Sequence, residues 1–282
     1  MRRFVLTLSC PDRMGIVAAV STFLLEHRCN IVDSAQFGDA LNGRFFMRVC
    51  FDAEAPRSAA DLETAFARVA EPFGMQYRFY DTATKPRVAI LVSKFGHCLN
   101  DLLYRYRIGA LPIEIPAIIS NHRDFEGLAA AHDIPYHYLP VEPATRTRQE
   151  QQLREIIDRE RCDLVVLARY MQILSPELCA HLRERAINIH HSFLPSFRGA
   201  RPYQQAHARG VKLIGATAHY VTEDLDEGPI IEQDVVRVTH RDSVSELVRK
   251  GSDLEKLVLA RAVRAHLEDR ILVHGNRTVV FA

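Results

Sequence analysis

The segment Ile187-Asn-Ile-His-His-Ser-Phe-Leu-Pro-Ser-Phe-Arg-Gly199 joins an apolar stretch to a polar turn. Residues 186–190 alternate with β-branched side chains, which predicts a short buried strand. Because alternate side chains of a strand share a face, Asn188 and His190 are expected to point the same way. Pro195 and Gly199 then predict a loop. An amide beside an imidazole at a strand end is typical of a site in an open α/β sheet.

A second strand, predicted at residues 213–221, runs into the acidic loop Thr222-Glu-Asp-Leu-Asp-Glu-Gly-Pro229. If the two strand ends are neighbours, Asp226 can orient His190 as a carboxylate orients a catalytic imidazole. Each motif alone has an ordinary explanation, because a lone strand histidine is usually packed or solvated and an acidic loop is usually a surface turn. The two motifs together favour a catalytic site.

The composition narrows the class of protein. The 282 residues suffice for two domains, and a net charge of +1 does not favour nucleic-acid or membrane partners. The first ten residues could be read as a signal peptide, but their apolar run is short and fits a strand better. The six cysteines form no Cys-x-x-Cys pair, which favours reduced thiols in the cytoplasm. The histidines show no zinc motif, so no metal is expected.

The first eighty residues predict the order βαββαβ, a ferredoxin-like layout. Strands are expected at residues 3–9, 30–37, 44–52 and 75–80, with helices at 16–27 and 59–69. Asp12 is a plausible cap of the first helix. The polar stretch that ends at Pro86 predicts a linker. From residue 87 onward strands and helices alternate, which predicts a doubly wound, mostly parallel sheet.

Two groups of motifs carry a resemblance to known families. The run Asn188-Ile-His190, Ser192-Phe-Leu-Pro195, His219 and Leu225-Asp-Glu-Gly-Pro229 resembles formyltetrahydrofolate-dependent formyltransferases. The runs Gly199-Ala-Arg-Pro-Tyr203 and Gly210-Val-Lys-Leu-Ile-Gly-Ala-Thr217 are similar to the formyltetrahydrofolate deformylase branch. The run Cys10-Pro-Asp-Arg-Met-Gly-Ile-Val17 resembles an ACT domain.

The resemblance implies an α/β protein of two domains. An N-terminal ferredoxin-like ACT α+β domain (residues 1–84) would regulate a Rossmann-like formyltransferase domain (residues 85–282). The implied reaction is hydrolysis of 10-formyltetrahydrofolate to tetrahydrofolate and formate. It would supply formate for purine synthesis and balance the one-carbon folate pool. No further cofactor is implied. A transfer-RNA formyltransferase would carry an added basic domain, which is not expected here.

The resemblance also assigns residues. Asn188, His190 and Asp226 would be catalytic, with Asn188 and a protonated His190 stabilising the developing oxyanion. Asp226 would orient His190 and position the attacking water, acting as general base directly or through that water. Which group carries each proton stays open. His219 would support the Asp226 loop, although simple packing explains it equally well. The positions matching the folate pocket are Met171, Gln172, Ile173, Leu174, Thr222, Glu223 and Asp224. Without the resemblance, Met171 and Ile173 would be read as ordinary core residues.

In the ACT-like domain, the positions matching an effector pocket are Asp12, Arg13, Gly15, Ile16, Asn30 and Ile31. The expected effector is an amino acid, methionine or glycine, bound across a paired interface, which implies a homo-oligomer. Backbone N–H groups at the start of a helix suit a carboxylate. The alternative is that Gly15 only relieves the turn and Asp12 only caps the helix.

The loop Ser93-Lys-Phe-Gly-His-Cys-Leu-Asn-Asp101 bears on the acceptor of the formyl group. Formyltransferases that act on glycinamide ribonucleotide have a glycine-rich turn here, whose backbone approaches the substrate phosphate. The side chains expected in that space are those of Phe95, His97, Cys98 and Leu99, so water is favoured as the acceptor. His97 is given no catalytic role. Two alternatives remain: a transferase that uses another amine, and a non-catalytic folate- or amino-acid-binding regulator.

Overall fold

A computed structural model of the chain describes residues 2–54, 58–142, 144–195 and 202–282. It divides into two compact units. The first is Met1–Lys85 together with Ala265–His274 and Thr278–Ala282, and the second is Pro86–Arg264 with Gly275–Arg277. The sequence predicts one boundary at residues 84 and 85 and carries no sign that the C-terminal segment groups with the first unit.

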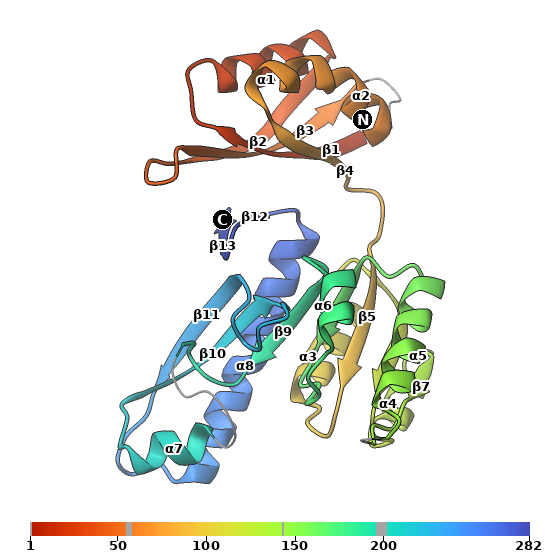
Figure 1. Ribbon diagram of the computed structural model, residues 1–282, viewed down its shortest axis with the longest axis vertical. Helices are drawn as coiled ribbons and strands as arrows, with labels where there is room; N and C mark the ends of the chain where they lie inside the picture. The colour runs from red at the N-terminus through yellow and green to blue at the C-terminus, as the bar shows by residue number, and fades with distance from the viewer. Residues whose placement is uncertain (1, 55–57, 143, 196–201) are drawn as a thin grey trace. The chain divides into compact units, whose positions relative to one another are not determined.

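The first unit confirms the βαββαβ order. Its elements are β1 (Arg2–Pro11), α1 (Ile16–Glu26), β2 (Cys29–Asp39), β3 (Arg44–Ala53), α2 (Ala59–Ala70), a short 3-10 helix η1 (Glu71–Phe73) and β4 (Gln76–Asp81). The sheet has the order β2-β3-β1-β4, with every pair antiparallel. Both helices cover the same face of this sheet (Figure 1). Aromatic and aliphatic residues such as Phe4, Phe51 and Phe66 are buried between the helices and the sheet.

The start of α1 differs from the prediction. Gly15 is the N-cap residue, with φ of 93°, and no side chain caps the helix, so the predicted Asp12 cap is wrong. The left-handed backbone conformation at this position favours glycine because a Cβ would be strained there. Gly15 therefore sets the direction in which α1 leaves β1.

The second unit is the predicted doubly wound domain. Its elements are β5 (Arg87–Val92), α3 (His97–Arg107), β6 (Glu114–Ser120), α4 (Glu126–Ala130), β7 (Tyr136–Tyr138), α5 (Arg146–Arg159), β8 (Leu164–Leu167), α6 (Pro176–His181), β9 (Ala186–His190), α7 (Pro202–Ala208), β10 (Leu213–Tyr220), β11 (Ile230–Arg237) and α8 (Val244–Leu267). The sheet order is β11-β10-β9-β8-β5-β6-β7. The five strands from β9 to β7 are parallel, and β10 and β11 add an antiparallel edge.

The strand order reverses at β5. The chain passes from β5 to β6 and β7 on one side and returns to β8 and β9 on the other. Ligands of open α/β sheets bind at the carboxyl ends of the strands at such a switch point. Helices α5 and α6 pack on one face of the sheet, in a cluster that includes Leu91, Leu153 and Leu178. A ligand site is therefore expected at the loops that follow β5 and β8.

Several elements differ from their predicted bounds. Helix α3 begins at His97, inside the loop that the sequence places at residues 93–101. Cys98 and Leu99 are therefore buried in the core, and their side chains are not in the acceptor space as predicted. The helix start that the sequence predicts at residues 242–246 is confirmed, because the Ser243 N–H donates to the Glu246 carboxylate and the Glu246 N–H donates to Oγ of Ser243. Helix α8 then continues without a break, where the sequence predicts a separate helix at residues 253–268. Near the C-terminus, strand β12 (Ile271–His274) pairs with strand β13 (Arg277–Val280) across the turn at Gly275. None of the described helices combines the length and apolarity needed to span a membrane.

Candidate functional site

The site is built around His190, the last residue of β9. Its Nδ1 lies 3.2 Å from Oδ2 of Asp226, and its side chain is only 7% exposed. A carboxylate only accepts, so Nδ1 carries the proton of this contact. The opposite ring nitrogen, Nε2, is buried and has no hydrogen-bond partner among the described residues. A buried polar atom without a partner is costly, so Nε2 is the atom that a substrate or water would meet.

The course of the loop that brings Asp226 to His190 is not indicated by the sequence. Strand β10 runs antiparallel to β9, so Tyr220 pairs with Ile187 at the start of β9 and not with its end. The loop after β10 must turn back to bring Asp226 to His190. Asp226 adopts a left-handed backbone conformation with φ of 58°, which is uncommon outside glycine and is often found at functional sites.

The charge state of Asp226 follows from its neighbours. Burial raises the pKa of this carboxyl, but hydrogen bonds and charge from His190 and His219 outweigh it and hold the pKa well below its usual range. The carboxylate therefore stays ionised at neutral pH. It is a weak base and a good orienting group for the imidazole.

Asn188 and His219 face each other across β9 and β10. The Nδ1 of His219 lies 2.9 Å from the carbonyl oxygen of Tyr220, so this nitrogen donates. Nε2 of the same ring lies 3.2 Å from the Asn188 amide nitrogen. Nε2 also lies 3.7 Å from Oδ1 of Asp226. His219 thus contacts two of the three predicted catalytic side chains.

A second histidine, His191, stacks on His190 with ring centroids 5.0 Å apart. Burial, with the nearby charges of Arg169 and His190, lowers the pKa of His191 to about 4. His191 is therefore uncharged at neutral pH. The sequence alone assigns this residue no role.

The loop after β8 holds the residues predicted to line the folate pocket. Met171 and Ile173 are about half exposed, at 50% and 56%, while Leu174 is buried. Exposed apolar side chains in an anchored loop can form the wall of a ligand slot. The reading of Met171 and Ile173 as ordinary core is therefore wrong, and Gln172 lies half-buried between them.

Neighbouring elements fix this loop. The Met171 N–H donates to Oγ of Ser93 at the end of β5, over 3.0 Å. From α5, Arg146 donates to the Ile173 carbonyl, and Glu150 accepts from the Ser175 N–H. These anchors were not predicted, because the partners lie far apart in the sequence.

The opposite loop carries Thr222, Glu223 and Asp224. The Thr222 hydroxyl donates to the Asp224 carbonyl over 3.0 Å, and the two acidic side chains are exposed. Val221 packs against the cluster that contains Leu174, so the two predicted folate loops are neighbours. The Gly199–Arg201 part of the predicted deformylase motif lies outside the described residues.

The predicted effector residues do not all come together within one chain. Asp12, Arg13, Gly15 and Ile16 follow the end of β1, whereas Asn30 and Ile31 begin β2. Asn30 pairs with Asp52, which pairs with Arg3 near the start of β1. Along an extended strand this places the two groups roughly 25 Å apart.

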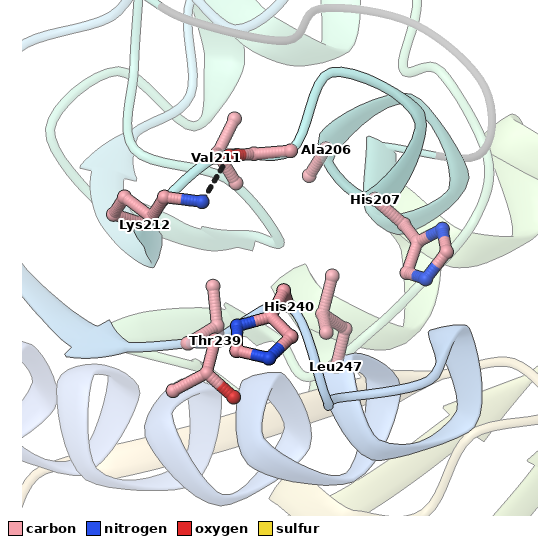
Figure 2. Close-up of a pocket in the computed structure, with 9 residues that line it drawn as sticks. Ala206, His207, Val211, Lys212, Thr239, His240 and Leu247 are labelled. Atoms are coloured by element: carbon pink, nitrogen blue, oxygen red, sulfur yellow. Dashed lines mark hydrogen bonds between the residues drawn. The ribbon is translucent and has the colours of Figure 1, made fainter.

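One pocket of ≈ 180 Å³ lies elsewhere in the second unit, between the end of α7 and the turn that leads into α8 (Figure 2). Ala206, His207, Lys212, His240 and Leu247 are among its lining residues. The Lys212 ammonium donates to the Gly210 carbonyl. None of the predicted site residues lines this pocket.

Gly228 fixes the shape of the Asp226 loop, and its substitution gives a direct test. A Cβ at this position would lie 1.8 Å from the Tyr220 carbonyl oxygen, which is also the acceptor for His219. Gly228→Ala must therefore displace backbone, and we expect turnover to fall by about tenfold to a hundredfold, with a loss of stability of about 1–3 kcal/mol.

Steady-state kinetics and thermal unfolding would check this prediction. Gly127→Ala on α4 is the matched control, because a Cβ there meets nothing within 4 Å. Gly228→Ala with wild-type kinetics would show that the loop geometry does not control the site.

Comparison with known proteins follows the division into two units. Residues 86–263 match the formyl transferase family, and residues 2–80 match the ACT domain family. The chain is 50% identical over 278 residues to a formyltetrahydrofolate deformylase of Bacillus subtilis (strain 168), covering 98% of this chain and 93% of the relative.

Solved structures agree. A formyltetrahydrofolate deformylase from Pseudomonas syringae pv. tomato str. DC3000 superposes with a TM-score of 0.98 at 53% identity, covering 100% of this chain and 95% of the other. A glycinamide ribonucleotide transformylase from Symbiobacterium toebii matches with a TM-score of 0.66 at 32% identity, over 72% of this chain and 97% of its own. The similarity to the deformylases extends through both units, and the chain belongs to the formyltetrahydrofolate deformylase family.

Proposed function

We propose that Asn188, His190 and Asp226 carry out the hydrolysis of 10-formyltetrahydrofolate to tetrahydrofolate and formate. The observation that supports this assignment most is the state of His190. Its Nδ1 is held by the Asp226 carboxylate, and its buried Nε2 has no partner among the described residues. An oriented imidazole with one nitrogen available is the arrangement that general acid–base catalysis needs.

The proton transfers can be written for these groups. Nε2 of His190 takes a proton from the attacking water, whose oxygen bonds to the formyl carbon. The Asn188 amide donates to the oxyanion that forms. Asp226 remains ionised and stabilises the imidazolium. His190 then gives the proton to N10 of the folate, the carbon–nitrogen bond breaks, and tetrahydrofolate leaves with formic acid, which ionises to formate.

These steps assign each proton to a group, a question that the amino-acid sequence alone leaves open. A carboxylate whose pKa is held well below its usual range is a poor proton acceptor, so His190 suits the role of base better than Asp226 does. The two exposed apolar side chains Met171 and Ile173 would contact the pterin ring, and Thr222, Glu223 and Asp224 would close the other side of the slot.

Formate release by the purified protein, with no amine added, is the primary test. Catalytic formate production supports hydrolysis. A well-folded protein that releases formate only when an amine is supplied would be a transferase, and one that binds the folate without releasing formate would be a regulator.

In the cell, we place the reaction in the cytoplasm, as a source of formate for purine synthesis and a control on the one-carbon folate pool.

We further propose that the ACT domain binds methionine or glycine at the turn before α1. The backbone at Gly15 leaves N–H groups at the start of the helix, and the Arg13 guanidinium lies over the Phe73 ring, 4.5 Å from its centroid. Because Asn30 and Ile31 lie at the other end of the sheet, a pocket that includes them needs a second copy of the chain. This requirement supports a homo-oligomer.

Either amino acid is expected to change the rate of formate release. Gly15→Ala puts a Cβ on a left-handed backbone with φ of 93°, so the turn and its N–H donors must shift. Because these donors would face the effector, we expect the effector concentration for half the response to rise about tenfold. Gly74→Ala is the matched control, since Gly74 also has positive φ, at 60°, and a Cβ there meets nothing within 4 Å. Equal effector responses in both variants and the wild type would argue against the site.

A further inference from the structure

The pocket between the end of α7 and the turn before α8 is lined by none of the residues assigned to the reaction or to the effector. Its volume is ≈ 180 Å³. An apolar cavity of about 150 Å³ holds a molecule of benzene, so this pocket has room for a small organic molecule. Figure 2 shows Lys212 and His207 on opposite sides of the space, with His240 and Leu247 on the side of the turn. The chemistry of these lining residues decides what kind of molecule fits.

One wall of the pocket is apolar and firmly held. Ala206 and Leu247 are buried in one packed cluster, and Val211 packs against the same cluster. The Val211 N–H donates to the Ala206 carbonyl over 3.2 Å. The Val238 N–H donates to the Lys212 carbonyl over 3.0 Å, which joins the segment before β10 to the segment after β11. A preformed apolar wall of this kind favours a ligand with a hydrocarbon body.

The nitrogen-bearing side chains of the lining are all basic. They are Lys212, His207 and His240, and no carboxylate belongs to the lining. The Lys212 ammonium donates to the Gly210 carbonyl over 3.0 Å and has no carboxylate partner among the described residues. Because an ammonium has three N–H donors, the others are available to a ligand. The pocket therefore offers charge-assisted hydrogen bonds to an anion.

The acidic side chains next to the pocket do not neutralise this basic rim. Asp242 accepts from the Thr239 N–H and pairs with Lys250 at 2.8 Å. Glu246 accepts from the N–H and the hydroxyl of Ser243 at the start of α8. Both carboxylates have partners of their own, and neither lines the pocket. An amine would therefore meet basic side chains and no carboxylate.

We propose that this pocket is a binding site for a small apolar monocarboxylate, a branched-chain acid without an amino group. Its hydrocarbon part would pack against the apolar wall, and its carboxylate would accept hydrogen bonds from Lys212. An amino acid would bring an ammonium that finds no carboxylate in the lining, so this ligand class differs from the effectors proposed for the ACT domain. Inorganic phosphate would leave the apolar wall exposed to water.

Binding would stabilise α7, which connects the pocket to the surroundings of His190. Near the start of this helix, Tyr203 is buried against Gly251, where a Cβ would lie 2.0 Å from the phenol oxygen. The Tyr203 ring lies 6.1 Å from the ring of His191, which stacks on His190. The other end of the same helix lines the pocket. A bound carboxylate would thus hold in place the helix to which Tyr203 belongs.

Isovalerate, isoamyl alcohol and isoamylamine separate charge from shape, because they share a branched hydrocarbon body and differ in the polar end. Ligand-observed NMR titration of the full chain should give a dissociation constant for isovalerate on the order of a millimolar, as its small size allows. We expect the alcohol to bind about tenfold more weakly, and the amine more weakly still. Equal affinities for the acid and the alcohol, or no binding of isovalerate, would overturn the proposal.

Lys212→Met removes the charge and keeps the length of the side chain. It should raise the dissociation constant for isovalerate about tenfold and leave that for isoamyl alcohol unchanged. Lys256→Met is the matched control, since Lys256 lies on α8 outside the pocket and pairs with Asp253. The control should bind isovalerate as the wild type does. If both variants bind isovalerate equally well, Lys212 does not hold the carboxylate and the assignment is wrong.

Hydrogen exchange followed by mass spectrometry locates the bound molecule independently. Isovalerate should slow amide exchange in α7 and at residues 238–243 in the wild type and in Lys256→Met, and should do so less in Lys212→Met. Protection confined to the ACT domain or to the loops around His190 would place the ligand elsewhere and refute the site. None of these measurements uses formate release, so they decide the pocket whether or not the chain hydrolyses 10-formyltetrahydrofolate.

Discussion

Asp226→Asn is expected to lower formate release from 10-formyltetrahydrofolate by about 10³–10⁴-fold with little change in folding. The substitution keeps the size of the side chain but removes the charge that faces Nδ1 of His190 at 3.2 Å. The neutral amide can present its NH₂ group to the ring, which favours the wrong tautomer, and it cannot stabilise an imidazolium. The loss should appear mainly in kcat, because the folate slot is unchanged.

The measurement is steady-state formate release with no amine acceptor. Glu227→Gln, an exposed carboxylate next to Asp226, is the matched control and should retain activity within about tenfold. Because the pKa of Asp226 is depressed, its charge is lost only in strong acid. A fall in wild-type activity near neutral pH would thus belong to another group. Full activity in Asp226→Asn would refute the catalytic assignment even if formate is produced.

His190→Gln is expected to reduce turnover by about 10²–10⁴-fold, since glutamine can pair with Asp226 but cannot carry a proton to N10. His191→Gln is the control: it changes the adjacent ring, which is uncharged at neutral pH because its pKa is about 4. We expect a loss of less than about tenfold there. Comparable losses in both variants would mean that the stacked pair matters and not the Nε2 atom of His190.

Combining Asp226→Asn with His190→Gln tests whether the two side chains act as one unit. If Asp226 works only through His190, the double variant should be about as slow as the slower single variant, because effects within a catalytic unit are not additive. Losses that multiply would instead indicate that Asp226 acts on the water by itself. Rates of the four proteins under one set of conditions decide between these outcomes.

Local sequence patterns predict much of the architecture. The βαββαβ order of the first unit and the alternating strands and helices of the second follow from hydrophobic periodicity, which each segment carries by itself. Asn188 and His190 share a face because side chains alternate along any strand. The same local rules failed at element ends: Gly15 and not Asp12 begins α1, since a left-handed residue can start the helix without a side-chain cap.

Other features depend on residues distant in sequence that pack together. Antiparallel pairing places the end of β10 beside the start of β9, so only the turned-back loop, with Asp226 at φ of 58° and Gly228 against Tyr220, brings Asp226 to His190. The sequence also gives no sign that the Glu255 carboxylate of α8 is buried in contact with His97, Arg169 and Tyr203, because these residues come from separate segments and a charged residue on a helix is usually solvated.

The sequence by itself determined the type of each element, the family and the residues with the chemistry for catalysis. Periodicity, turn residues and motif spacing are properties of the local chain. The tertiary structure decided which nitrogen of His190 is available, which loop anchors hold the predicted folate slot, and that Glu255 is buried against Arg169. Burial and close approach are set by packing among distant segments, and those segments carry no local mark of their partners.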